Sequence, residues 1–206
     1  MTSRKSRGFS LLELMIVIAI GLTMASVTFI MLMPLFKKNH LDQAYDITLS
    51  VLRTYRNQSI TKYTRFIVTF PTASTINVQE WDFPTPNSVA PAPLAPVTFT
   101  LPQDIQFAIQ GGFPNPGPDN FTGATAVSFN ACAVLESGNP CLIFYPDGSA
   151  EDDAGVPGNF DSGVVYLTQP TSNAYSSRAI DVWGTTGRIR GWRLYNISGT
   201  NTWVQQ

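Results

Sequence analysis

The N-terminal region contains a long apolar run that predicts a membrane-spanning helix. Phe9–Phe36 is almost wholly apolar, and Glu13 is its only charged residue. Its central part, Leu14–Met33, is 20 residues long, and a helix of that length spans the roughly 30 Å hydrocarbon layer of a bilayer. A short basic segment, residues 1–8, precedes the run, and positive charges there hold the N-terminal end in the cytoplasm. We therefore expect the rest of the chain on the outer side of the membrane.

Two simpler interpretations explain this segment less well. A secretory signal peptide has an apolar region of only about 7–15 residues that ends in a small-residue cleavage site. The run in this chain is longer, and its Ala-x-Ala-like triplets lie inside it. A plain single-pass anchor explains the length, but neither Glu13 nor the abrupt junction between Gly8 and Phe9. A lone carboxylate costs about 2.5–3.5 kcal/mol at mid-membrane and less near the edge, so Glu13 predicts a partner outside its own helix.

After the apolar run, the spacing of apolar positions changes twice. Between Asn39 and Thr61 they recur at three- and four-residue steps, which predicts an amphipathic helix with one face on a folded domain. Runs rich in β-branched and aromatic residues then predict strands at 65–70, 75–81, 97–101, 105–109, 126–130, 142–145, 164–168, 179–183 and 188–195. Segments 83–96 and 111–123 read as loops, and Gly184–Gly187 as a tight turn.

These elements predict an α+β fold. The turns are too closely spaced for helical crossovers, so the sheets should be antiparallel. We expect a long N-terminal helix, made of a membrane anchor and an amphipathic half, packed on an antiparallel β domain. The expected organisation is a leader at 1–8, a transmembrane and assembly helix at 9–36, an amphipathic continuation at 37–62 and a β-rich globular domain at 63–206.

Composition argues against an enzyme. Hydrophobic residues make up 44% of the chain and charged residues 13%, with a net charge of −1 at pH 7. The chain has one histidine, His40, which is too few for a zinc site built on several histidines. Its place near the membrane end of a predicted helix also argues against a Ser-His-Asp triad. We therefore expect neither catalysis nor a cofactor. Between Arg65 and Arg178 the chain carries acids but no Lys or Arg, and basic residues return only near the end.

The residues around the Gly8–Phe9 junction resemble a known processing motif. The stretch Arg7-Gly8-Phe9-Ser10-Leu11-Leu12-Glu13 is similar to the prepilin motif of type IV pilins and type II secretion pseudopilins. The resemblance implies that prepilin peptidase cleaves between Gly8 and Phe9 and that Phe9 is then N-methylated. It also implies assembly through Phe9 and Glu13, with Glu13 meeting the N-terminal amine of a neighbouring subunit. An α-amine with a pKa near 7.7–8.0 is largely cationic at neutral pH and can neutralise such a carboxylate.

The C-terminal region resembles one branch of this family. The pattern Phe144-Tyr-Pro-Asp-Gly-Ser149, a Val-Val-Tyr-Leu strand and the stretch 178–190 are similar to the minor pseudopilin H and FimT/FimU branch. In FimT-like members a Gly-Arg-x-Arg element is associated with DNA binding during uptake, and Gly187-Arg-Ile-Arg190 matches it. Arg188 and Arg190 are thus candidates for weak, salt-sensitive and sequence-blind DNA binding. The alternative is a strand whose arginines pair with nearby acids, which the acidic remainder of the domain favours.

The two cysteines predict a structural disulfide. Cys132 and Cys141 are the only cysteines, and the predicted topology places them outside the cytoplasm, where disulfides persist. Closing so small a loop contributes somewhat under ~3 kcal/mol in the chain-entropy model. Two free buried thiols are the alternative, and the spacing is not that of a redox-active CxxC.

An acidic loop is a weak calcium candidate. Asp147, Glu151, Asp152 and Asp153 lie with Asp161 in a glycine-rich segment, and clustered carboxylates can hold Ca²⁺. Their spacing does not match an EF-hand loop, and a solvated acidic loop is the usual meaning of such a run. No metal is therefore expected.

The sequence as a whole predicts a minor pseudopilin of a type II secretion system that supports protein export. The alternative is a FimT/FimU-like minor pilin that primes a type IV pilus or binds DNA for uptake. The expected partners are prepilin peptidase, other pilin or pseudopilin subunits in a hetero-oligomeric filament and the inner membrane. DNA is a possible but less favoured partner. The expected location is the bacterial inner membrane, crossed once, with the C-terminal domain in the periplasm.

Overall fold

The computed structural model describes residues 10–81, 95–121, 125–132, 138–152, 158–170 and 174–206. The chain divides into two compact units, Met1–Asn39 and His40–Gln206. Helix α1 (Leu11–Lys62) runs through both units, and its helical backbone continues through Pro34. In the first unit, the described side chains of α1 up to Phe29 are all exposed.

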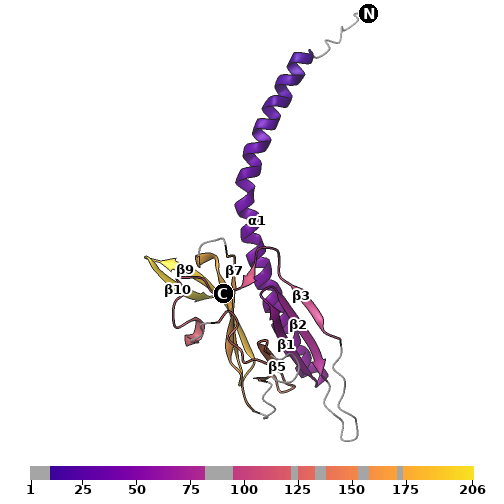
Figure 1. The fold of residues 1–206 in the computed structure, drawn as a ribbon, viewed down its shortest axis with the longest axis vertical. Helices are drawn as coiled ribbons and strands as arrows, with labels where there is room; N and C mark the ends of the chain where they lie inside the picture. Colours follow the sequence, from indigo (N-terminus) through magenta and orange to yellow (C-terminus); the bar gives the residue numbers. More distant parts are fainter. Residues whose placement is uncertain (1–9, 82–94, 122–124, 133–137, 153–157, 171–173) are drawn as a thin grey trace, which may run out of the picture. The chain divides into compact units, whose positions relative to one another are not determined.

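The second unit is built on two antiparallel sheets (Figure 1). In order across the first sheet, the strands are β3 (Val97–Thr100), β2 (Thr75–Trp81), β1 (Arg65–Thr72), β5 (Cys141–Phe144) and β6 (Ala150–Glu151). The second sheet has β10 (Thr200–Gln205), β9 (Arg188–Ile197), β8 (Arg178–Trp183), β7 (Gly163–Thr168) and β4 (Gln106–Phe107). Two short 3₁₀ helices, η1 (Pro118–Asn120) and η2 (Ala174–Ser176), lie in the connections. Every strand pairing within the described residues is antiparallel, so the predicted α+β class is confirmed.

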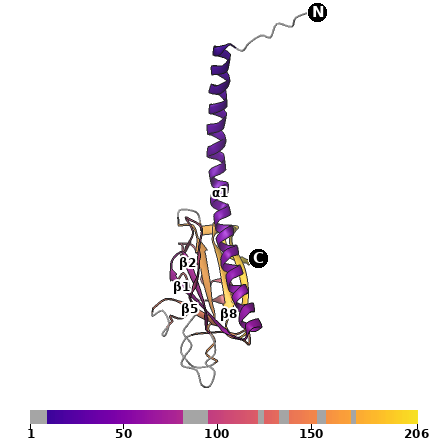
Figure 2. The same cartoon turned by 90° about the vertical axis from the view of Figure 1, so that its right-hand side faces the viewer.

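The main core lies between the last part of α1 and both sheets. Leu41, Ala44 and Leu52 come from one face of the helix, with Thr48 completing the three- and four-residue steps, and they are almost completely buried. They belong to the same cluster as Phe66 of β1 and Ile180 of β8, and Figure 2 shows this part of α1 beside these strands. The amphipathic spacing of α1 thus supplies one apolar stripe that closes the core of the domain.

The other faces of the two sheets carry smaller clusters. On the first sheet, Ile67 and Ile143 pack with the cysteine pair. On the second sheet, Leu194 and Trp203 join Tyr166 in a cluster against which Phe113 packs. Because strands alternate their side chains, a strand buried on both faces reads as a continuous apolar run, and all six residues of β7 are buried.

Three details of the strand prediction are wrong. Segment 126–130 forms only a single bridge, Val127 to Val165, and the segment at 105–109 shortens to the two residues of β4. Strands β6 and β10 were not predicted, because β6 is only two residues long and β10 is rich in Thr and Asn. Most of the predicted loop at 83–96 lies outside the described residues, as does the predicted leader.

Candidate functional site

The start of α1 presents an uncovered apolar surface around one carboxylate. Leu11–Phe29 has a mean hydropathy of 2.1, with no residue buried, and is long and apolar enough to cross a membrane. Glu13 lies in the first turn of α1, where the unpaired backbone N–H groups and the helix dipole favour a negative charge. Exposure of this apolar helix surface to water is unfavourable. Its side chains therefore require lipid or other helices around them.

Glu13 has no ion-pair partner among the described residues. The residues next to it in the sequence, Leu12 and Leu14, are 69% and 55% exposed, so the carboxylate lies within an uncovered apolar stretch of the helix. Gly8 and Phe9, the predicted cleavage junction, lie outside the described residues.

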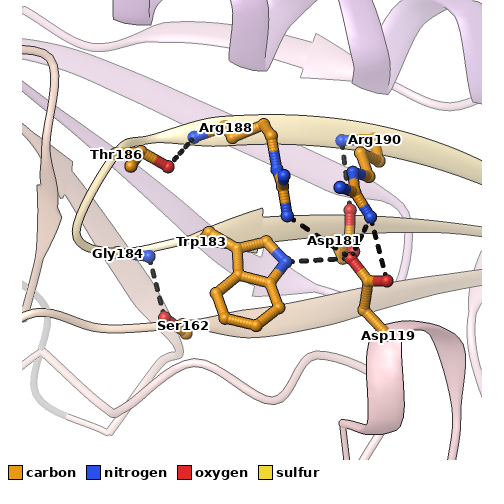
Figure 3. Close-up of polar contacts among 8 residues, drawn as sticks. All are labelled: Asp119, Ser162, Asp181, Trp183, Gly184, Thr186, Arg188 and Arg190. Atoms are coloured by element: carbon orange, nitrogen blue, oxygen red, sulfur yellow. Dashed lines mark hydrogen bonds and ion pairs between the residues drawn. The ribbon is translucent and has the colours of Figure 1, made fainter.

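A second group of functional candidates lies on β8 and β9. The tight turn at 184–187 returns the chain so that Trp183 pairs with Arg188 and Asp181 with Arg190. Opposite residues in an antiparallel pair lie on the same face of a sheet, so these four side chains share one face of the second sheet (Figure 3). The register therefore brings both predicted arginines together.

Asp119 of η1 connects these side chains, and no local sequence pattern indicated this role. Arg190 Nη1 donates to both carboxylate oxygens of Asp119, at 2.9 and 2.7 Å. Trp183 Nε1 donates to Asp119 Oδ2 at 3.0 Å, and Arg188 Nη2 lies 3.8 Å from the same oxygen (Figure 3). Asp119 adopts a left-handed backbone conformation with φ of 51°, which Asp tolerates better than most residues. Asp119 and Arg190 are 71 residues apart, so local pattern does not reveal the pair.

Asp181 is a fully buried acid beneath this group. Its Oδ1 accepts a hydrogen bond from the backbone N–H of Arg190 at 3.1 Å. Burial, followed by the hydrogen bond and negative charge of Asp119, raises the pKa of Asp181 to about 7. Burial alone would raise the pKa of Asp119 as well, but hydrogen bonds with Asp181 and Trp183 and the charge of Arg190 lower it. Asp181 is therefore the carboxyl of the two that takes up a proton first as the pH falls.

The two predicted DNA-binding arginines are in different states. Arg190 is bound by Asp119, and its side chain is 24% exposed. Arg188 remains 48% exposed, and its guanidinium lies 5.4 Å from the ring centre of Trp183. The structure therefore supports the interpretation of paired arginines for Arg190, whereas Arg188 keeps much of its charge available. DNA binding itself stays a prediction.

The predicted disulfide is present. Cys132 and Cys141 are bonded to each other and buried. They pack with Ile67 and Ile143 on the outer face of the first sheet, so the bond joins the segment before β5 to β5 itself.

The acidic calcium candidates are not gathered into a ligand set in the described residues. Asp147 accepts hydrogen bonds from the backbone and hydroxyl of Ser149, which lower the pKa of Asp147. Glu151 accepts a hydrogen bond from the backbone of Gly158, and Asp152 accepts from two asparagines, Asn130 and Asn159. Asp161 accepts from the backbone of Asn130, and Asp153 lies outside the described residues. No group of three or more possible metal-ligating side chains occurs in the part that the structure describes.

Comparison with known proteins gives one match, at the N-terminus. Residues 3–29 match the family model described as the prokaryotic N-terminal methylation motif. No curated protein and no solved structure matches the chain. The match supports a type IV pilin-like protein that is processed by prepilin peptidase and assembles with other pilins. Together with the apolar helix it suggests a single-pass membrane anchor, and the motif belongs to a structural rather than an enzymatic family.

Proposed function

We propose that the chain is a minor pseudopilin that assembles into the periplasmic filament of a type II secretion system and supports protein export. The leader at 1–8 is removed between Gly8 and Phe9, and Phe9 is methylated. The observation that carries this proposal is the methylation motif at residues 3–29 joined to a helix whose described side chains are uncovered from Leu11 to Phe29.

Assembly follows from the physical properties of this helix. Apolar side chains on all sides of a helix suit lipid before assembly and other helices after it. The new N-terminal amine of a neighbouring subunit is largely cationic at neutral pH, and it is the natural partner for Glu13, which has none among the described residues. In an apolar bundle an unpaired carboxylate is expensive, so this pairing sets the register between subunits. The domain, residues 63–206, then lies in the periplasm and contacts partner proteins.

A FimT/FimU-like minor pilin, which primes a type IV pilus or binds DNA, is the second candidate. The observation that favours it is the Gly187-Arg-Ile-Arg190 element with Arg188 half-exposed at its turn. Deletion of the gene separates the two, because loss of protein export supports the pseudopilin and loss of surface fibres supports the pilin. An Arg188→Glu variant that retains assembly but loses DNA retention would establish the DNA-binding role.

The first test is the mass of the mature protein. Cells with and without prepilin peptidase should yield two different N-termini. With the peptidase, the chain should start at Phe9 and carry one added methyl group, and without it the chain should start at Met1. A second prepilin measured in the same cells controls for peptidase activity. A chain that still starts at Met1 while the control prepilin is cleaved would refute the proposed processing.

The second test addresses Glu13 separately from cleavage. A Glu13→Gln variant keeps the shape of the side chain and removes its charge, so it should be processed normally but should fail to co-purify with the other subunits. Glu80→Gln is the matched control, because Glu80 pairs with Lys62 in the domain, far along the chain. Equal co-purification of the Glu13→Gln variant and the wild type would contradict the proposed role of the charge.

A further inference from the structure

A pocket of about 500 Å³ lies between α1 and the turn that joins β8 to β9. The lining residues are Arg53, Arg56, Asn57, Thr186, Gly187, Arg188 and Ile189. Three of them are arginines, and none of the described lining residues is acidic. This concentration of positive charge is unexpected in a domain whose central part carries acids but no Lys or Arg.

Arg56 is fixed in place without being neutralised. Its Nε donates to the carbonyl of Gly148 at 3.1 Å, and its Nη2 donates to the carbonyl of Thr186 at 2.8 Å. Both acceptors are uncharged, so the guanidinium keeps its full positive charge. A Cβ at Gly187 would clash with the Gly148 carbonyl and with Arg56 Nε. The turn therefore needs glycine at 187 to lie this close to Arg56, and the pocket wall is preorganised.

Arg53 and Asn57 extend the same wall along the helix. Residues 53, 56 and 57 are three and four positions apart, so they lie on one face of α1. Arg53 and Asn57 are exposed. Within the described part of the chain, Arg53 forms no ion pair. Its guanidinium therefore remains available to a ligand.

Arg188 lines the pocket by its position at the turn, but its side chain points to the face of the second sheet that lies away from α1. It shares the single Asp119 carboxylate with Arg190, which holds that carboxylate at the shorter distance of 2.7 Å against 3.8 Å for Arg188. One carboxylate cannot neutralise two guanidinium groups. The positive charge of Arg188 is thus held near Trp183 on that other face, and Arg53 and Arg56 supply the guanidinium groups on the α1 side of the pocket.

We infer that this pocket binds a carboxylate of an acidic peptide segment supplied by a partner protein. Guanidinium groups bind carboxylates through paired, charge-assisted hydrogen bonds, and a preorganised arginine loses less freedom in doing so. The amide of Asn57 and the hydroxyl of Thr186 add neutral donors, and Ile189 offers an apolar contact. The inference does not rest on the filament role, because it requires only the folded domain.

The distribution of positive charge favours a peptide over a nucleic acid. A polyanion requires a basic track along which successive phosphates bind. Outside the pocket, Arg178 is buried and paired with Asp42, and Arg190 is paired with Asp119. Arg193 also lies outside the pocket, where it stacks over Tyr195. The pocket itself therefore offers a compact cluster of positive charge.

The test is a titration of the full-length protein in detergent micelles. ¹⁵N labelling of arginine makes the side-chain Nε–H signals visible, and single variants assign them. The probes are the capped peptide acetyl-Gly-Asp-Asp-Gly-amide and its matched asparagine analogue. Arg53→Gln removes one charge from the pocket, whereas Arg188→Gln removes a charge that lies over Trp183 on the other face of the sheet. Arg193→Gln is the matched control, because Arg193 lies on the same strand as Arg188 but stacks over Tyr195 outside the pocket.

The aspartate peptide should shift the Arg56 signal saturably, and the asparagine peptide should not. Loss of Arg53 should weaken binding about threefold or more, the size expected for a partly exposed charge pair, and loss of Arg188 should have a smaller effect. Arg193→Gln should leave the affinity unchanged, and added salt should weaken binding of the wild type. Equal binding of both peptides, or equal losses in the Arg53→Gln, Arg188→Gln and Arg193→Gln variants, would overturn the inference, because of these three arginines only Arg53 presents its charge in the pocket. Tighter binding of a short oligodeoxythymidylate or of inorganic phosphate to the same signals would overturn the peptide assignment.

Discussion

The buried carboxyl of Asp181 makes the stability of the domain depend on pH. Its folded-state pKa of about 7 lies above the ordinary value of 3.8 for an aspartate, so the folded protein binds more protons than the unfolded chain between those values. The free energy of unfolding therefore falls as pH rises from about 4 through 7. Each pKa unit corresponds to about 1.4 kcal/mol, which gives roughly 2–3 kcal/mol lost between pH 5 and pH 8.

The Asp181→Asn substitution should remove most of this loss. Asparagine has the shape of the protonated acid, its oxygen can accept the Arg190 N–H, and its amide can donate toward Asp119. The free energy of unfolding of this variant should fall by less than about 1 kcal/mol between pH 5 and pH 8. At pH 8 the variant should be at least as stable as the wild type. A residual slope is expected, because burial also raises the pKa of Asp161.

Denaturant unfolding of the full-length protein in micelles, followed by tryptophan fluorescence, measures these free energies. Trp183 reports directly, because its indole N–H donates to Asp119. Asp46→Asn, which changes an exposed acid on α1, is the matched control and should keep the slope of the wild type. Two results would refute the reasoning. One is a wild-type free energy of unfolding that is equal at pH 5 and pH 8, and the other is a free energy of unfolding of the Asp181→Asn variant that falls as steeply with pH as that of the wild type.

Three further predictions concern the packing of the domain, and the same unfolding assay checks each of them. Asp42→Asn should cost about 1–3 kcal/mol, because it leaves the buried guanidinium of Arg178 without its charge partner; wild-type stability would contradict this. Gly191→Ala should cost about 1–3 kcal/mol, because the new methyl group meets the Tyr45 hydroxyl. A Tyr45→Phe background should recover part of that cost, and an equal cost in both backgrounds would exclude this contact as the cause. Reducing the disulfide should cost about 2–3 kcal/mol, and an unchanged transition under reductant would show that it does not stabilise the domain.

The local sequence pattern was enough to predict an element wherever the residues of that element themselves determine its surroundings. The apolar run from Phe9 carries its solvent preference in its own side chains, so the candidate membrane helix was predicted from composition and length. The three- and four-residue spacing that runs from Leu41 to Leu52 predicted which face of α1 is buried, because a helix fixes that geometry locally. The alternation in β2 and the apolar run of β7 predicted those strands for the same reason.

Tertiary structure alone decided the chemistry of the domain. Sequence spacing placed Arg188 and Arg190 on one face, but it did not reveal Asp119, which arrives from a distant loop and binds Arg190. Asp181 reads as an ordinary acid in a strand, and only burial beneath Asp119 raises its pKa. The arginine pocket likewise requires α1 to lie against the β8–β9 turn. Charge interactions depend on distance and burial in space, which local periodicity does not encode, whereas membrane preference and helix amphipathicity depend on residues adjacent in the chain.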